Sequence, residues 1–188
     1  IYDNTIGLFG GRDVIGAVLV NPTTGECVDY TIDEIRNDEK LSWLDRVYDP
    51  ELLVEQYDYY GKYVNGFWNS IFGQSGVKKA TVGSSYIAMD DDVYIYTGVT
   101  SVTADESILG FILINQRTKE AVFYNTTGAT EAAAQNSAQG ALSDKGWSAT
   151  FPLLINLDGE KLVPLTKENA GEILPYEETT VMGKFKAL

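Results

Sequence analysis

The first half of the chain contains two pairs of apolar runs that have the pattern of β-strands. Residues 14–20 are apolar and rich in β-branched side chains, and a turn at residues 21–25 separates them from a second run at residues 26–32. This order of run, turn and run predicts a β-hairpin. A further pair of runs, at residues 80–89 and 93–99, predicts another hairpin.

Between these hairpins, the spacing of large side chains predicts a helix. Residues 33–49 predict a loop or a short helix, and Asp49 and Pro50 are then expected to cap and begin the main helix. Apolar residues recur there at intervals of three and four, which places them on one face that we expect to be buried. The members of this face are Leu53, Tyr57, Tyr60, Val64, Phe67, Trp68 and Ile71. Gly61 and Gly66 weaken a helix by about 1 kcal/mol each relative to alanine, and we interpret them as points of close packing on a sheet.

The second half begins with the same order of elements. Residues 108–115 and 120–124 predict two strands around a turn. An alanine-rich helix is expected from residue 129 to residue 142. Either Thr127 or Thr130 is expected to cap it, because a threonine oxygen accepts a hydrogen bond from the first helical turn.

A last hairpin is expected near the C-terminal end. The Asp158-Gly159 dipeptide is a strong turn signal, and strand-like runs at residues 147–157 and 161–165 flank it. A short helical turn at residues 167–170 and a last strand at residues 173–185 complete the predicted elements.

The two halves also share residues at matching positions. A shift of 94 residues superposes residues 16–30 on residues 110–124, and Gly, Asn, Thr, Glu, Val and Tyr coincide. In the later hairpins, Ile87, Met89 and Asp90 fall on Ile155, Leu157 and Asp158. Apolar strands resemble one another by chance, but the coincident polar residues favour a duplication of hairpin, helix and hairpin.

A single hairpin-helix-hairpin unit would leave one face of its sheet bare, whereas two units can cover each other. We therefore expect an α+β fold of two related units, residues 1–105 and residues 106–188, in one compact body. The antiparallel sheets are expected to pack on helices with pseudo-twofold symmetry.

The stretch from Val20 to Glu26 resembles the strand-turn-strand signature of PepSY-type domains. Asn21 stands where that motif has Asp, and in the second copy Asn115 takes this place while Lys119 replaces the motif's Gly. The resemblance implies small α+β modules outside the bacterial cytoplasmic membrane that bind or restrain partners such as peptidases.

Longer stretches, residues 63–70, 90–98 and 149–154, are similar to a family of uncharacterised, membrane-anchored extracytoplasmic proteins of Gram-positive bacteria. This resemblance spans nearly the whole chain. It implies an extracytoplasmic location and an anchor outside this chain, and it implies no known activity.

Composition narrows the classes of partner. The 188 residues include 14 Lys and Arg against 27 Asp and Glu, a formal net charge of -13. This charge repels phosphate backbones and anionic lipid headgroups, so nucleic acid and membrane surfaces are not expected partners. No stretch has the roughly 18 apolar residues that span a bilayer, and we expect the chain itself not to be inserted in a membrane.

The start of the chain and its cysteine content add two expectations. The chain begins at Ile1, and we interpret it as a segment of a longer or processed protein whose signal or anchor lies outside it. Cys27 is the only cysteine, which excludes an intrachain disulfide and a cysteine-rich zinc site.

Candidate chemistry is limited because the chain has no histidine, the commonest general base and metal ligand. Glu26 and Glu120 are equivalent under the duplication and are candidates for the paired carboxylates of a glycoside hydrolase. A solvated or turn-stabilising role is the alternative. Asp90, Asp91 and Asp92 are candidate calcium ligands. Their spacing matches no calcium loop, and an exposed hairpin tip is the alternative.

Tyrosines are candidate binding residues. Tyr59 and Tyr63 lie beside the core face of the predicted helix, and Tyr94 and Tyr96 alternate on a predicted strand. Such amphipathic rings line sugar and peptide grooves, or they pack at the rim of a core.

Together, these patterns favour a non-enzymatic, extracytoplasmic binding or regulatory domain of a larger membrane-anchored protein. Its expected partner is a protein or a cell-envelope component, and no cofactor is expected. The alternatives are a passive structural spacer and, last, a carboxylate-based hydrolase.

Overall fold

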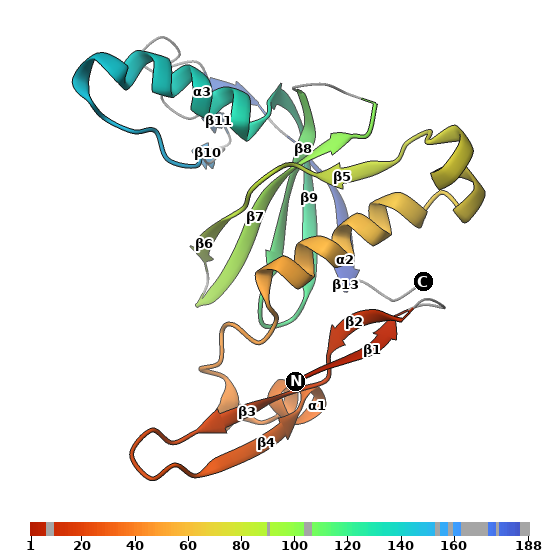
Figure 1. Ribbon diagram of the computed structural model, residues 1–188, viewed down its shortest axis with the longest axis vertical. Helices are drawn as coiled ribbons and strands as arrows, with labels where there is room; N and C mark the ends of the chain where they lie inside the picture. The colour runs from red at the N-terminus through yellow and green to blue at the C-terminus, as the bar shows by residue number, and fades with distance from the viewer. Residues whose placement is uncertain are drawn as a thin grey trace.

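The computed structural model describes residues 1–5, 10–89, 91–103 and 107–152 with their side chains, and the backbone of Ile6. It also describes the backbone of four later strands at residues 155–157, 160–162, 173–175 and 177–184. The predicted helical turn at residues 167–170 and the Asp158-Gly159 turn lie outside the described residues. The mixed α+β class with antiparallel sheets is confirmed (Figure 1).

A six-stranded antiparallel sheet forms the centre of the molecule. Its order is β13-β9-β8-β7-β5, and β6 also pairs with β7. Strands from both sides of residue 105 therefore share one sheet. The bounds are β5 Lys78–Ala80, β6 Ser85–Met89, β7 Asp92–Ser101, β8 Ser107–Asn115, β9 Glu120–Ala129 and β13 Glu177–Lys184.

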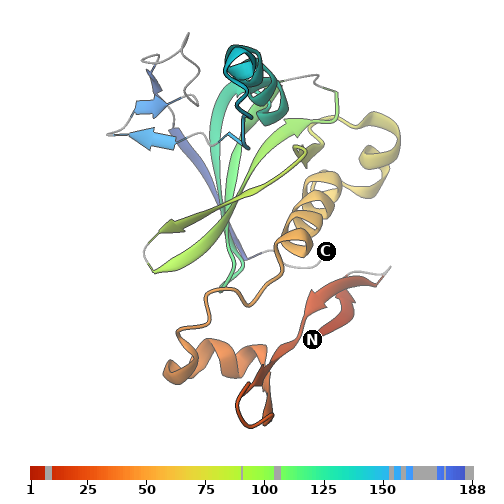
Figure 2. The ribbon, with the colours of Figure 1, turned by 60° about the vertical axis from the view of Figure 1, so that its left-hand side comes forward.

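Among the described residues, three smaller sheets accompany the central sheet. The strands β1 and β2 form one hairpin, β3 and β4 form another, and β10, β11 and β12 form a three-stranded sheet. The β1–β2 and β3–β4 hairpins lie beyond one end of the central sheet (Figures 1 and 2). The bounds are β1 Tyr2–Ile6, β2 Gly11–Val14, β3 Gly16–Val20, β4 Cys27–Thr31, β10 Ile155–Leu157, β11 Glu160–Leu162 and β12 Ile173–Pro175.

The helix α2, Pro50–Tyr63, covers one face of the central sheet (Figure 1). As predicted, Asp49 caps it by accepting hydrogen bonds from the N–H groups of Glu51 and Leu52. Close packing at Gly61 is confirmed, because a Cβ there would lie 2.3 Å from the carbonyl oxygen of Lys78 in β5. The buried residues of α2 pack on alternating side chains of β7, β8 and β9.

The expected core face is wrong beyond the end of α2. Leu53 and Tyr57 are buried, but Val64, Phe67, Trp68 and Ile71 are exposed. The helix stops at Tyr63, and Gly66 has the left-handed φ of 94° that ends a helix rather than a packing contact. A π-helical turn, Asn69–Gly73, follows, in which Ser70 is buried and the apolar Ile71 and Phe72 side chains are exposed.

The other helices are short and capped by threonine. Thr31 caps α1, Ile32–Asn37, in a capping box with Glu34. Thr130 caps α3, Glu131–Leu142, which selects between the two predicted caps. A short 3-10 turn, Glu39–Leu41, follows α1, and another, Ser143–Lys145, follows α3.

A polar junction joins the N-terminal hairpins to the central sheet. The Lys119 ammonium donates to both carboxylate oxygens of Asp13, at 2.9 and 3.1 Å, and lies 5.5 Å from the centre of the Tyr48 ring. Gln56 of α2 donates to the same Asp13 carboxylate at 3.1 Å. Burial raises the pKa of the Tyr48 hydroxyl, to which Arg36 donates a hydrogen bond. The Asp13 contacts fix the β1–β2 hairpin against α2 and the turn between β8 and β9.

Candidate functional site

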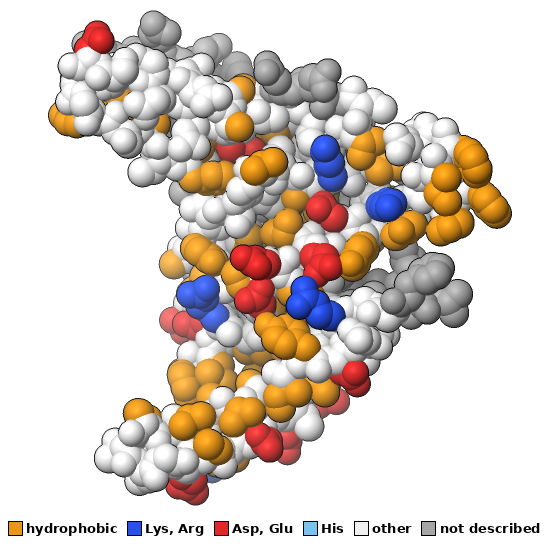
Figure 3. Space-filling view, in the orientation of Figure 1, with side chains coloured by type: hydrophobic (Ala, Val, Ile, Leu, Met, Phe, Trp, Pro, Cys, Tyr) orange, Lys and Arg blue, Asp and Glu red, His pale blue; other side chains and the backbone are white. Residues whose placement is uncertain are grey.

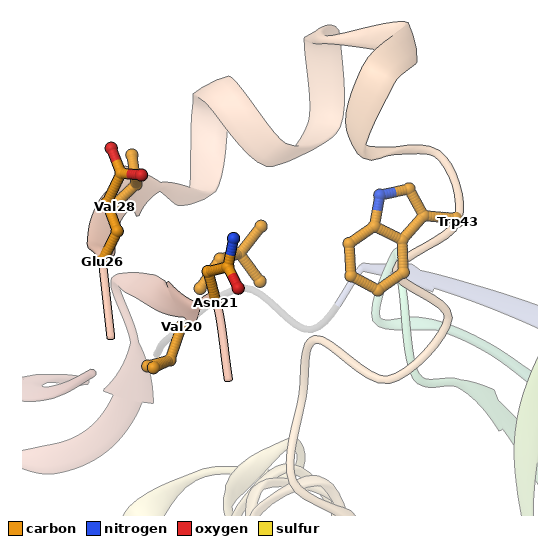
Figure 4. A pocket seen from close by; sticks show the side chains of 6 residues that line it. Val20, Asn21, Glu26, Val28 and Trp43 are labelled. Carbon is orange, nitrogen blue, oxygen red and sulfur yellow. The ribbon is translucent and has the colours of Figure 1, made fainter. Parts of the chain in front are cut away.

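A hollow of about 340 Å³ lies beside the β3–β4 hairpin. Its lining is mostly apolar and consists of Leu19, Val20, Asn21, Glu26, Val28 and Trp43. Trp43 stands on one side and the hairpin on the other (Figure 4). A concave surface with apolar walls and few polar groups is the usual form of a binding site.

The hairpin register creates one wall of this hollow. Leu19 pairs with Val28 across the two strands, so both side chains point to the same face of the hairpin. Val28 on this face remains 41% exposed, and Val20, which follows Leu19 and so points to the opposite face, is 58% exposed. Hydrophobic side chains of a two-stranded sheet stay exposed in this way when no second layer covers them.

Trp43 forms the opposite wall and is 64% exposed. It lies just after the 3-10 turn that ends at Leu41, which is buried. Further along, the N–H groups of Val47 and Tyr48 donate to the carbonyl of Gln116 in the β8–β9 turn, at 3.1 and 2.8 Å. The segment that carries Trp43 is therefore held at both ends, which positions the indole ring across the hollow.

The polar edge of the hollow comes from the hairpin turn. The Asn21 side-chain oxygen accepts hydrogen bonds from the N–H groups of Thr23 and Thr24 at 2.9 and 3.3 Å, so it is engaged within the turn. Glu26 is exposed and gives the lining its one charge. The edge therefore offers a carboxylate to a ligand amide or ammonium group.

The structure does not bring the two predicted glutamates into one site. Glu26 precedes β4 in the two-stranded sheet, whereas Glu120 begins β9 of the central sheet. Both are exposed. Glu26 lines the hollow, and Glu120 does not.

The predicted tyrosines lie in two different environments. On α2, the Tyr59 hydroxyl donates to Glu55 at 2.7 Å, which raises the pKa of Tyr59, and Tyr63 stacks on Phe67 with ring centres 6.2 Å apart. On β7, Tyr96 is only 1% exposed, and Tyr94 packs beside it on a second core cluster. None of the four lines the hollow.

The acidic tip of the β6–β7 hairpin is only partly described, because Asp90 lies outside the described residues. Asp91 is exposed and has a left-handed φ of 66°. Asp92 is engaged by Arg117 at 2.6 Å and by the Asn115 amide at 2.7 Å. Within the described part of the chain, no three His, Cys, Asp or Glu side chains gather as metal ligands.

Sequence reasoning did not find the main walls of the hollow. The apolar run at residues 14–20 predicts a strand but does not show which face stays uncovered, and Trp43 is separated from β3 by β4 and α1. A second unforeseen group is Glu131, which is 5% exposed and has no hydrogen-bond partner for either carboxylate oxygen. It lies directly over Gly98, where a Cβ would be 2.2 Å from its oxygen.

Comparison of the chain with protein-family models, with curated proteins and with solved structures found no match. The assignment of a function therefore rests on the geometry of the hollow and on the sequence.

Proposed function

We propose that the chain is a non-enzymatic binding domain that holds an extended apolar segment of a partner protein in the hollow beside β3 and β4. The observation that supports this most directly is the exposed apolar lining of the hollow, with Trp43 facing the hairpin (Figure 4). Large, exposed aromatic side chains in a concave site are typical anchors of protein interfaces. In the described part of the chain, β3 and β4 pair only with each other, which leaves outer edges for a third strand.

We also propose the setting of this domain. The PepSY resemblance supports an extracytoplasmic location, a membrane anchor in another part of a longer protein and a regulatory role in restraining a partner. Among the described residues, no helix has the length and apolar character to cross a bilayer.

We further propose that the two halves arose by duplication of a PepSY-like unit. The turns of the two equivalent hairpins support this. Asn21 and Asn115 each accept two backbone hydrogen bonds from the following turn residues, and Gly25 and Lys119 have left-handed φ values of 75° and 67°.

The binding proposal can be tested with a panel of labelled, extended peptides with alternating apolar residues, measured by fluorescence anisotropy. Trp43→Ala is expected to weaken the best binder at least tenfold, because it removes one wall of the hollow. Trp147→Ala is the matched control, since Trp147 is 60% exposed and lies after α3. The peptide affinity of the Trp147→Ala variant is expected to stay within twofold of that of the protein without substitutions.

Other results would select the alternatives. Absence of binding across the panel would favour a passive spacer. Cleavage of a peptide or glycan probe that is lost in Glu26→Gln would instead favour a hydrolase.

A further inference from the structure

The segment between α2 and β5 carries five large apolar side chains that the fold leaves exposed. They form a protrusion at one edge of the molecule (Figures 1 and 3), and we call them the aromatic wedge. Its members, with their exposed fractions, are Val64 at 45%, Phe67 at 47%, Trp68 at 69%, Ile71 at 48% and Phe72 at 77%. Contiguous exposed apolar surface of this kind marks an interaction site.

The charges around the wedge have a definite arrangement. Residues 63–77 contain no Asp, Glu, Lys or Arg, although the chain as a whole has a net charge of -13. Lys62 stands before the segment and Lys79 after it, whereas the ammonium of the adjacent Lys78 lies 4.5 Å from the centre of the buried Phe123 ring. The Lys62 ammonium lies 5.2 Å from the centre of the Tyr63 ring, beside the wedge.

Three polar side chains of the segment, those of Asn65, Asn69 and Ser70, form hydrogen bonds with the segment's own backbone. The Asn69 amide donates to the Ser75 carbonyl at 2.9 Å and accepts from the Ser75 N–H at 3.2 Å. The Asn65 amide donates to the Gly76 carbonyl at 3.3 Å, and the Ser70 hydroxyl donates to the Phe67 carbonyl at 2.7 Å. These backbone groups are therefore satisfied within the segment, as a lipid environment requires.

The aromatic rings are already arranged against one another. The centres of Phe67 and Trp68 lie 5.6 Å apart in an edge-to-face pair, and Trp68 stacks on Phe72 at 5.9 Å. Insertion of a preordered cluster loses less conformational entropy than insertion of mobile side chains.

We propose that the aromatic wedge docks into the headgroup region of a lipid bilayer. Tryptophan with flanking lysine is typical of membrane interfaces, where the ring is buried and the ammonium remains in water. A protein interface instead has about one hydrogen bond per 100–200 Å². The Asn65, Asn69 and Ser70 side chains of this segment use their hydrogen bonds on its own backbone rather than on a protein partner. Because the driving force is apolar burial, the wedge fits a bilayer of uncharged lipid, which avoids the repulsion between the acidic chain and anionic headgroups. This inference does not depend on the proposed peptide binding in the hollow, which lies beside the β3–β4 hairpin and not beside the aromatic wedge.

The test is flotation of the full 188-residue chain with vesicles of pure phosphatidylcholine. The double variant Trp68→Ser/Phe72→Ser is expected to lower the partition coefficient at least tenfold. The control Trp147→Ser replaces an equally accessible indole outside the wedge and is expected to change it by less than twofold. Circular dichroism checks that each variant keeps its fold, which is expected because the altered side chains are exposed.

Quenching of Trp68 fluorescence by brominated phosphatidylcholine, in a Trp43→Phe/Trp147→Phe background, supplies a second readout. Quenching supports docking at the wedge. The proposal is overturned if the unchanged chain does not float, or if the double variant floats equally well. It is also overturned if light scattering shows a lipid-free dimer that the double variant disrupts, because the wedge would then pair with a second copy of the chain.

Discussion

The β3–β4 and β8–β9 hairpins turn with the same hydrogen bonds, but their strands lie in opposite environments. Val18 of β3 is 44% exposed, whereas the equivalent Ile112 of β8 is fully buried. β3 has one neighbouring strand within the described residues, whereas β8 lies between β7 and β9 and beneath α2. Turn chemistry therefore determines where the chain reverses, and the neighbouring elements determine whether the hairpin becomes core or exposed surface.

The largest expected effect comes from truncating the side chains of the equivalent residues Ile112 and Val18 to alanine. Ile112→Ala is expected to lower the free energy of unfolding by about 3 kcal/mol, because it leaves a cavity in the core. Val18→Ala is expected to change it by less than about 1 kcal/mol, because Val18 already contacts solvent. Urea unfolding followed by near-ultraviolet circular dichroism measures both, and equal losses would contradict the contrast in burial.

The next largest effect on stability is expected from substitutions at Gly25 and Lys119, which occupy the same left-handed position in their two turns. Lys119→Met is expected to cost about 2 to 3 kcal/mol, because it leaves the Asp13 carboxylate without its ammonium partner. The expected loss of unfolding free energy is small for a buried ion pair because the Asp13 side chain keeps 26% exposure. Gly25→Ala, at the exposed turn, is expected to cost only about 1 kcal/mol through backbone strain.

A second change distinguishes the ion pair from the packing of the lysine stem. Asp13→Asn combined with Lys119→Met is expected to recover at least half of the loss, since no unpaired charge remains. A purely additive double variant in urea unfolding would show that the pair contributes through packing alone.

Signals confined to a few neighbouring residues predicted the structure well. The Asp49-Pro50 helix start and the Thr130 cap both depend on the residue itself and its immediate chain neighbours. The turn between β8 and β9 belongs to the same class.

Features that depend on distant segments could not be predicted in the same way. The three- and four-residue spacing of Val64, Phe67 and Trp68 is the same whether or not a sheet lies opposite, and here α2 has already ended. The hollow needs Trp43 to be placed across from Val28 by contacts with the β8–β9 turn. Periodicity contains no information about such placement.

The two turn asparagines allow a smaller test of the comparison. Asn115 is 4% exposed and also donates to Asp92 at 2.7 Å, whereas Asn21 is exposed and bonds only within its turn among the contacts described. Asn115→Ala is therefore expected to cost about 2 kcal/mol and Asn21→Ala about 0.5 kcal/mol. Thermal unfolding of the two variants measures the difference, and a larger loss for Asn21→Ala would contradict it.

The smallest expected effect is that the stability of α1 and the stability of α2 respond to pH in opposite directions. At α1, the hydrogen bond from the Thr31 N–H lowers the pKa of Glu34, so this stabilisation is present at neutral pH and is lost as the pH falls through the lowered pKa. At α2, burial raises the pKa of Asp58 although the Ala80 N–H and Lys79 oppose this. Protonation of Asp58 therefore favours the folded state, and that contribution is lost as the pH rises through the raised pKa.

Hydrogen exchange at pH 7 and at about pH 2.5, well below ordinary carboxyl pKa values, separates these responses. After correction for intrinsic exchange rates, amides of α1 are expected to lose protection at the lower pH, and amides of the α2–β5 contact are expected to keep theirs. Asp58→Asn is expected to raise the unfolding temperature at pH 7 and to leave it unchanged at the lower pH, because the amide cannot ionise. Glu34→Gln is expected to remove the pH response of α1, because its amide cannot ionise. A uniform loss of protection across both helices would show that the whole chain, rather than each cap, titrates as one unit.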